Sequence, residues 1–171
     1  MIRVFPVQCT ILMSNLSDNR SRTAVVGIGN YLRGDDGAGI HAVNRLRKIT
    51  ELHHIDIIDG ARAGPGLRFC LEGRSRVIFI DAGEFGGSPG EWTRFTPEEA
   101  VSHKGISSFS LHGFDLLSFL QSAEQETGIP QAVIYALQPE SCEAGTELSG
   151  PVSAGLDDMI PVLIGELRKH C

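Results

Sequence analysis

The chain has 171 residues, a length that suits one domain with a substantial core. Its hydrophobic content of 42% and charged content of 21% are those of an ordinary globular protein, and no apolar run approaches the roughly 20 residues needed to span a bilayer. The net charge of −6 offers no basic excess to neutralise phosphates, so we expect no nucleic-acid partner and no membrane partner.

The first 22 residues hold an apolar stretch that Pro6 and Gln8 interrupt. No small-residue cleavage site follows it, which argues against a secretion signal. We therefore expect residues 1–22 to be a flexible N-terminal extension ahead of a single domain over residues 23–171. The cysteines are scattered, without a CxxC pair, and predict free thiols in a reducing compartment, hence a cytoplasmic protein. They are Cys9, Cys70, Cys142 and Cys171.

Strands and helices alternate along the rest of the chain. Apolar, β-branched runs predict strands over 23–28, 54–60, 76–83 and 131–139, with an edge strand over 91–96. Apolar residues at helical spacing predict helices over 37–48, 65–71, 112–127 and 152–169. The polar segment 97–110 is predicted to be a loop. The alternation predicts a three-layer α/β/α fold in one domain, with a mainly parallel, twisted sheet and right-handed crossovers.

Three acidic residues follow the predicted parallel strands. Asp36 comes shortly after the first strand, Asp59 ends the second, and Asp81 lies at the end of the third. In such sheets, ligands bind beyond the carboxyl ends of the strands. We therefore expect these carboxylates together on open loops at one rim of the sheet.

The glycine-rich turn before Asp36 could also belong to a dinucleotide-binding loop. The segment GIGNYL contains G-x-G, but Leu32 stands where the third glycine of that fingerprint is expected. A pyrophosphate would also meet Asp35 and Asp36, at a Coulomb cost of about 1 kcal/mol per close charge pair even in water. Nucleotide binding is therefore disfavoured.

A cation suits these acids better than an anion does. Two carboxylates with a nearby imidazole are typical ligands of a borderline divalent transition metal. Of the histidines, His103 and His112 lie in the loop region after the third strand, and either could complete the site. Taken singly, an aspartate at a helix start is more often a cap than a ligand. Residue chemistry alone therefore leads to an acid–acid–histidine metal site whose histidine is open.

Five segments of the sequence resemble a known protein family. GIGNYLRGDDGAGIHAV resembles the opening signature of the maturation endopeptidases of nickel–iron hydrogenases, G-x-G-N-x-L-x-x-D-[DE]-x-x-G. Four further segments are similar to later blocks of that family, in the same order: DGARAGPGL, VIFIDAG, SLHGFDLL and ALQPESCEAGTELSGPVSAGL. The resemblance extends from residue 23 to about residue 168.

The resemblance implies an α/β peptidase domain that removes the C-terminal extension of a hydrogenase large-subunit precursor after nickel insertion. Asp36, Asp81 and His112 then correspond to the trio that contacts nickel and supports catalysis. Because the nickel arrives with the precursor, we expect no stoichiometric cofactor, although soaked Cd²⁺, Zn²⁺ or Ni²⁺ should find the three residues. The precursor is the expected partner, and the enzyme is expected to be a monomer.

Other residues of these segments receive structural interpretations. Gly27, Gly29 and Asn30 are expected to shape the turn, and Asp59 to be a turn acid. Glu140 could either form hydrogen bonds within its own loop or contact the tail of the substrate. The metal of the substrate could act as a Lewis acid, or one carboxylate could act as a general base. Two other functions stay open: a non-catalytic, metal-sensing chaperone of the same precursor, and a peptidase of this fold acting on another precursor.

Overall fold

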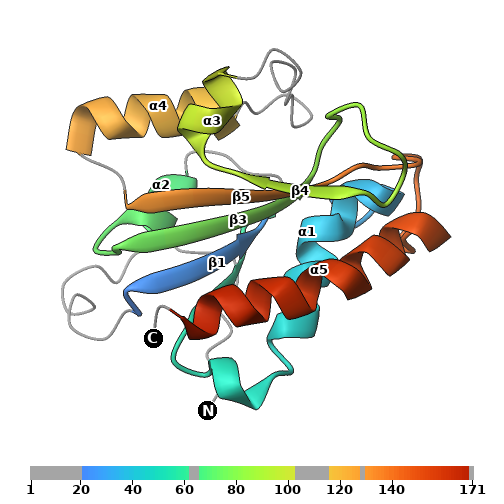
Figure 1. The fold of residues 1–171 in the computed structure, drawn as a ribbon, viewed down its shortest axis with the longest axis horizontal. Coiled ribbons are helices and arrows are strands. Elements are labelled where there is room, and N and C mark those ends of the chain that lie inside the picture. The colour runs from blue at the N-terminus through green and yellow to red at the C-terminus, as the bar shows by residue number, and fades with distance from the viewer. Residues whose placement is uncertain (1–20, 62–65, 103–115, 128–129, 170–171) are drawn as a thin grey trace.

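A five-stranded sheet forms the centre of the protein (Figure 1). The computed structural model describes residues 21–61, 66–102, 116–127 and 130–169. The strands are β1 (Thr23–Gly27), β2 (Asp56–Asp59), β3 (Arg76–Ala82), β4 (Trp92–Phe95) and β5 (Gln131–Leu137). Their order is β2-β1-β3-β5-β4, with the first four parallel and the edge strand β4 antiparallel to β5. The predicted mainly parallel sheet is confirmed.

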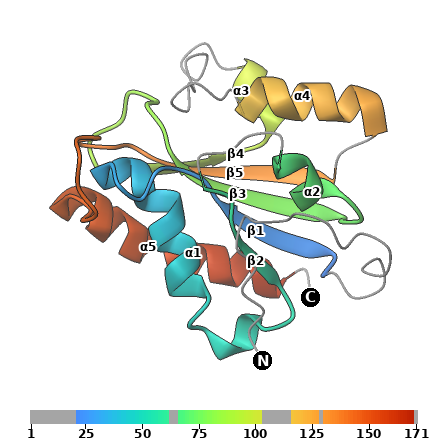
Figure 2. The ribbon, with the colours of Figure 1, turned by 180° about the vertical axis from the view of Figure 1, so that it is seen from behind.

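Helices cover both faces of the sheet (Figures 1 and 2). One face carries α1 (Ala38–Leu46) and α5 (Gly150–Arg168), whose buried residues share a core cluster with Val25, Ile78 and Val133. The other face carries α2 (Leu67–Leu71), α3 (Pro97–Ser102) and α4 (Leu116–Thr127). The result is the predicted three-layer α/β/α fold. Two short 3-10 turns, η1 (Gly34–Gly37) and η2 (Thr50–Leu52), flank α1 in the chain.

Strand β3 lies in the middle of the sheet and is buried along its whole length. Ile78 and Ile80 pack against the α1–α5 layer, whereas Val77 and Phe79 pack against the other helices. A strand covered on both faces favours apolar residues on both of its sides, which explains the continuous apolar run from Val77 to Ile80 between Arg76 and Asp81. Each of these side chains contributes roughly 1.5–3 kcal/mol through burial.

Helix α3 replaces the first part of the predicted loop over 97–110, so that prediction is wrong for residues 97–102. The helix begins with a capping box: the Glu99 amide donates to Thr96 Oγ1 at 3.3 Å, and the Thr96 amide donates to Glu99 Oε2 at 2.7 Å. Together with Pro97 at the first helical position, this arrangement satisfies the exposed amides of the first turn. The sequence TPEE at residues 96–99 contains the residues of this capping box.

The remaining predicted elements differ from the structure at their ends. The predicted helix over 37–48 starts earlier, as the 3-10 turn η1, which contains Asp35 and Asp36. In α4, Leu120 is buried as predicted, while Phe114 lies outside the described residues. Most of the predicted extension, residues 1–20, is also outside them. Among the described helices, none has the length and apolar content to cross a membrane.

The topology has a switch point between β1 and β3. From β1 the chain passes to β2 on one side of the sheet, and then returns past β1 to β3 on the other side. In open α/β sheets, ligands bind at such switch points, beyond the carboxyl ends of the strands. Asp36 follows β1 and Asp81 lies at the end of β3, so both lie at this switch point. The carboxyl ends point to the right-hand side of Figure 1.

Candidate active site at the carboxyl end of the sheet

The turn between β1 and α1 brings Asp36 into place. Gly29 has a φ of +129°, a conformation that favours glycine, and a Cβ there would lie 1.8 Å from the carbonyl oxygen of Asp36. The Asn30 amide donates to the same oxygen at 3.1 Å, and Asn30 Oδ1 accepts from the Leu32 amide at 3.1 Å. These contacts support the predicted structural roles of Gly29 and Asn30.

Two further glycines let α1 approach the sheet closely. A Cβ at Gly27 would lie 2.2 Å from the Gly39 oxygen, and a Cβ at Gly39 would lie 2.2 Å from the Ile80 oxygen. A side chain at either position would push the start of α1 away from β1 and β3. The glycines therefore set the distance between the turn that carries Asp36 and the strand end that carries Asp81.

Asp81 is fully buried, and so is almost all of Asp36. Asp81 Oδ1 accepts from the Ala82 amide at 2.7 Å, whereas Asp81 Oδ2 has no hydrogen-bond partner in the structure as described. Burial raises the pKa of Asp81 well above its usual range, and the negative charge of Asp36 raises it further. The expectation of acids on open loops is therefore wrong in one respect: the two carboxylates are close together but enclosed.

Asp35 has a different role from its neighbour. Its carboxylate accepts three backbone amides, from Glu140 at 2.9 Å, Ser141 at 3.0 Å and Ser149 at 2.7 Å. Burial opposes ionisation, but these hydrogen bonds outweigh it, so the pKa of Asp35 lies below its usual range. Asp35 thus fastens residues 138–149, which we call the β5–α5 loop, to the turn beside Asp36. Sequence reasoning missed this role, because nothing in the sequence links residues so far apart.

Additional bonds join the same two segments. Gly34 and Gly145 exchange backbone bonds with the opposite segment, the Gly34 amide donating to the Gly145 oxygen at 2.8 Å and the Gly145 amide to the Leu32 oxygen at 3.0 Å. Arg33 Nε donates to the Cys142 oxygen at 3.0 Å, and His41 Nε2 lies 3.0 Å from the Thr146 oxygen. The turn and the loop therefore form one connected rim at the end of the sheet.

Cys142 of this rim lies within the electrostatic influence of the acids. Burial raises the pKa of the Cys142 thiol, and the charges of Asp36 and Asp35 raise it further. A thiol kept protonated is a poor nucleophile.

The other candidates separate into structural and untested residues. Asp59 Oδ1 accepts from the Ala61 amide at 2.8 Å, and Ala61 has a φ of +48°, which favours the predicted turn role of Asp59. The Glu140 side chain is exposed, while its amide binds Asp35. His103 and His112 lie outside the described residues. Within the described ranges, no three histidine, cysteine, aspartate or glutamate side chains converge on a metal position.

The comparisons with known proteins decide the family. The model of the hydrogenase maturation protease family matches residues 40–166. The chain belongs to the hydrogenase maturation protease family. The match covers most of the chain, so the predicted family and the predicted class, a peptide-bond hydrolase, are confirmed.

Individual relatives agree with this assignment. A Methanocaldococcus jannaschii protein assigned as a hydrogenase maturation protease is 30% identical over 149 residues, which are 85% of this chain and 96% of that protein. HupD of Rhizobium leguminosarum, a hydrogenase expression/formation protein, is 30% identical over 84% of this chain and 70% of its own. The crystal structure of the nickel–iron hydrogenase maturation protease HycI from Thermococcus kodakarensis is similar with a TM-score of 0.70 and 25% identity, covering 91% of this chain and 99% of that one.

Proposed function

We propose that this protease removes the C-terminal extension of the nickel-loaded large-subunit precursor of a nickel–iron hydrogenase, acting in the cytoplasm as a monomer. The observation that carries the proposal is the buried pair Asp36–Asp81 at the switch point of the sheet, with one carboxylate oxygen that has no partner in the described structure. Buried polar atoms are rarely left unbonded without a functional reason. The names of the relatives, which refer to hydrogenase maturation and formation, support the precursor as substrate.

The proposed ligands of the substrate's nickel are Asp36, Asp81 and His112. Carboxylate and imidazole groups suit a borderline divalent metal, and Asp81 Oδ2 is a buried acceptor without a partner among the described residues. In this proposal the metal belongs to the substrate and not to the protease. We therefore expect the dialysed protein to hold no stoichiometric metal, and the nickel to stay with the precursor until cleavage.

In this proposal Asp81 contacts the metal. Asp81 Oδ1 accepts a hydrogen bond from the Ala82 amide, and Asp81 Oδ2, which has no described hydrogen-bond partner, is the oxygen that we assign to nickel. With Asp81 as a ligand, the nickel of the precursor acts as the Lewis acid that polarises the scissile carbonyl or its attacking water. Nickel binding then requires Asp81 to lose the proton that burial favours, which couples metal contact to proton release.

The test compares nickel-loaded and nickel-free precursor as substrates of the purified protein. We expect the mass of the large subunit to fall by that of one C-terminal peptide with the nickel-loaded form alone. Cleavage of both forms would contradict recognition through the metal. Release of an uncleaved precursor would favour the chaperone, and cleavage of neither hydrogenase precursor would favour a different protein substrate.

A further inference from the structure

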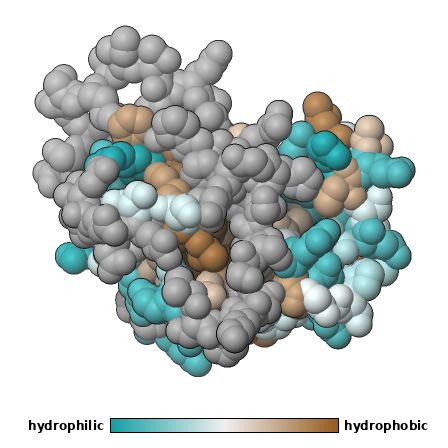
Figure 3. Space-filling view, turned by 90° about the horizontal axis from the view of Figure 1, so that it is seen from above, coloured by the Kyte–Doolittle hydropathy of each residue, from teal (hydrophilic) through white to brown (hydrophobic). Residues whose placement is uncertain are grey.

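Exposed apolar side chains gather next to the candidate site. Within the described residues, the large apolar side chains that are exposed are Tyr31, Leu32, Phe69 and Val162. Tyr31 and Leu32 are consecutive and lie in the turn that leads to Asp36, with exposed fractions of 43% and 64%. We call this pair the Tyr31–Leu32 ridge. In the space-filling view, hydrophobic residues reach the surface among hydrophilic ones at the right-hand end, where the strands end (Figure 3).

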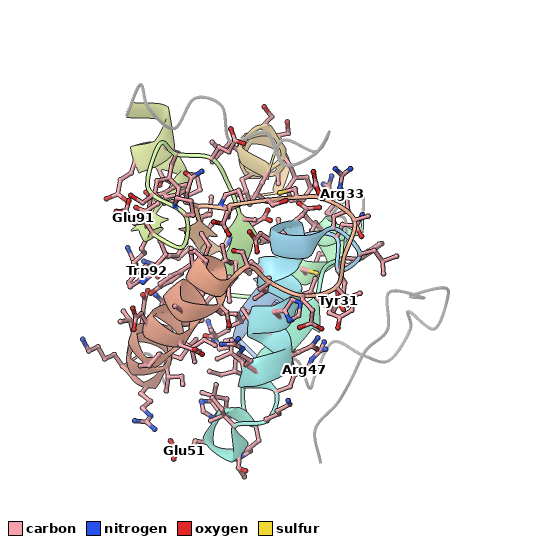
Figure 4. All side chains as sticks on the ribbon, turned by 90° about the vertical axis from the view of Figure 1, so that its right-hand side faces the viewer. Tyr31, Arg33, Arg47, Glu51, Glu91 and Trp92 are labelled. Carbon is pink, nitrogen blue, oxygen red and sulfur yellow. The ribbon has the colours of Figure 1, made fainter. Side chains whose placement is uncertain are left out.

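Hydrogen bonds fix the backbone of the ridge at Leu32, and a stacking contact fixes the ring of Tyr31, although both side chains are exposed. The Leu32 amide donates to Asn30 Oδ1, and the Leu32 oxygen accepts from the Gly145 amide. The Tyr31 ring stacks on His41 of α1 with ring centroids 5.0 Å apart. Figure 4 shows Tyr31 and Arg33 beside the first turns of α1, on the side of this end away from Trp92. A surface that is ordered before binding loses little conformational entropy when a partner docks.

The ridge and Asp36 belong to the same turn. The Asn30 amide donates to the Asp36 oxygen, and a Cβ at Gly37 would lie 3.1 Å from Tyr31 Cα. A polypeptide whose bond reaches the Asp36–Asp81 pair therefore passes close to the ridge. Among the described residues, neither core cluster includes Leu32.

We propose that the Tyr31–Leu32 ridge is the docking surface for an apolar side chain of the protein substrate, close to the bond that is cut. The inference rests on the proposed function. Exposed charges flank the ridge: Arg33 follows Leu32, and Glu143 and Glu147 lie two residues on either side of Gly145, whose amide donates to the Leu32 oxygen. Two acids and one base leave a net negative charge, so an apolar substrate residue with basic or neutral neighbours fits this surface better than one with acidic neighbours.

The test uses Leu32→Ala, with Val162→Ala as the matched control. Both positions expose an aliphatic side chain, but Val162 lies in the second half of α5, away from the carboxyl ends of the strands. We expect Leu32→Ala to raise the KM for nickel-loaded precursor by about five- to tenfold, with kcat unchanged, because truncation removes a central apolar contact. A thermal melt should show little change for either variant, since exposed side chains contribute little to stability.

The outcomes separate the inference from the function on which it rests. Wild-type cleavage with a raised KM for Leu32→Ala and a normal KM for Val162→Ala supports the ridge. Wild-type cleavage with an unchanged KM for Leu32→Ala overturns the ridge and leaves the protease function standing. An equal rise in both variants also overturns it, because the effect would not be local. Failure of the wild type to cleave the precursor overturns the proposed function and the ridge with it.

Discussion

Two regions of the molecule bury charged groups, and they treat them in opposite ways. On the α5 face of the sheet, Glu166 accepts hydrogen bonds from Arg76, Arg94 and Tyr135. Burial alone would raise the pKa of Glu166, but the bonds from Arg94 and Tyr135 and the nearby positive charges lower it to about 2. At the carboxyl end of the sheet, Asp81 lies near the negative charge of Asp36, one of its oxygens has no partner among the described residues, and its pKa is raised.

The contrast distinguishes a structural cluster from a reactive one. The carboxylate of Glu166 accepts hydrogen bonds from three side chains of this chain, although two nitrogens of Arg76, Nε and Nη1, are buried without a described partner. Among the described residues, the carboxylate of Asp81 accepts only the Ala82 amide, and a cation brought by the substrate would supply a second partner. Changes in the two regions should therefore have separable effects on processing and on stability.

The largest effect is expected from Asp81→Asn, which should abolish processing of nickel-loaded precursor. A neutral amide is a poor ligand for a divalent metal and cannot take up a proton. Because the folded-state pKa of Asp81 is raised, ionisation of this group costs wild-type stability as pH rises from its usual range through the raised value. The variant lacks that cost and should be at least as stable as the wild type at pH 7, with a flatter pH dependence. Cleavage assays beside urea unfolding measure both effects, and full cleavage by the variant would remove Asp81 from the site.

The second effect concerns stability alone. Glu166→Gln leaves Arg76, which is 4% exposed, without its counter-charge, and should lower the free energy of unfolding by about 3 kcal/mol. The Glu166 contribution is fully present above the usual glutamate pKa and is lost as pH falls toward 2, so the difference from wild type should shrink in acid. Processing per folded molecule should not change. Urea unfolding at neutral and acidic pH tests this, and a variant as stable as wild type at pH 7 would show that the cluster is not structural.

The third change affects the rim between the two regions. Asp35→Asn places an amide where three backbone amides donate, and should cost about 2 kcal/mol through lost hydrogen bonds. The pKa of Asp35 is lowered, so its contribution is present above the usual aspartate pKa and is lost as pH falls through the lowered value. Hydrogen exchange should accelerate at the amides of Glu140, Ser141 and Ser149 more than in β3. Equal acceleration in both places would mean that Asp35 supports the whole fold and not the rim.

Much of the fold could be predicted from the sequence, because strands that are buried on both faces of a parallel sheet consist largely of continuous apolar runs. Strand β3 is the clearest case, since each of its residues is buried. The missed helix α3 is short and polar, and its signal was the capping box at Thr96 and Glu99, which does not depend on apolar periodicity.

The candidate site was predictable in part. Strand ends identified Asp36 and Asp81 as neighbours, because parallel strands deliver their carboxyl ends to one edge. The different role of Asp35 could not be predicted, because it depends on the β5–α5 loop, in which Glu140 is separated from Asp35 by 105 positions in the sequence. Loop positions are set by such individual hydrogen bonds and leave no periodic pattern in the sequence.

The smallest effect is expected from Asp59→Asn, which controls for the position of an acid at the carboxyl end of a parallel strand. Asp59 also follows a parallel strand at the carboxyl end of the sheet, yet its Oδ1 is already bonded to the Ala61 amide at 2.8 Å. Asparagine retains an oxygen that can accept this bond, so the loss of stability should stay below about 1 kcal/mol. Most of the processing of nickel-loaded precursor should remain. The contrary result would be an Asp59→Asn variant that loses processing as completely as Asp81→Asn while its melting temperature is unchanged. An acid whose hydrogen bond is already made would then be part of the reactive site. In that case, the difference between bonded and unbonded carboxylates would not identify the residues that act on the substrate.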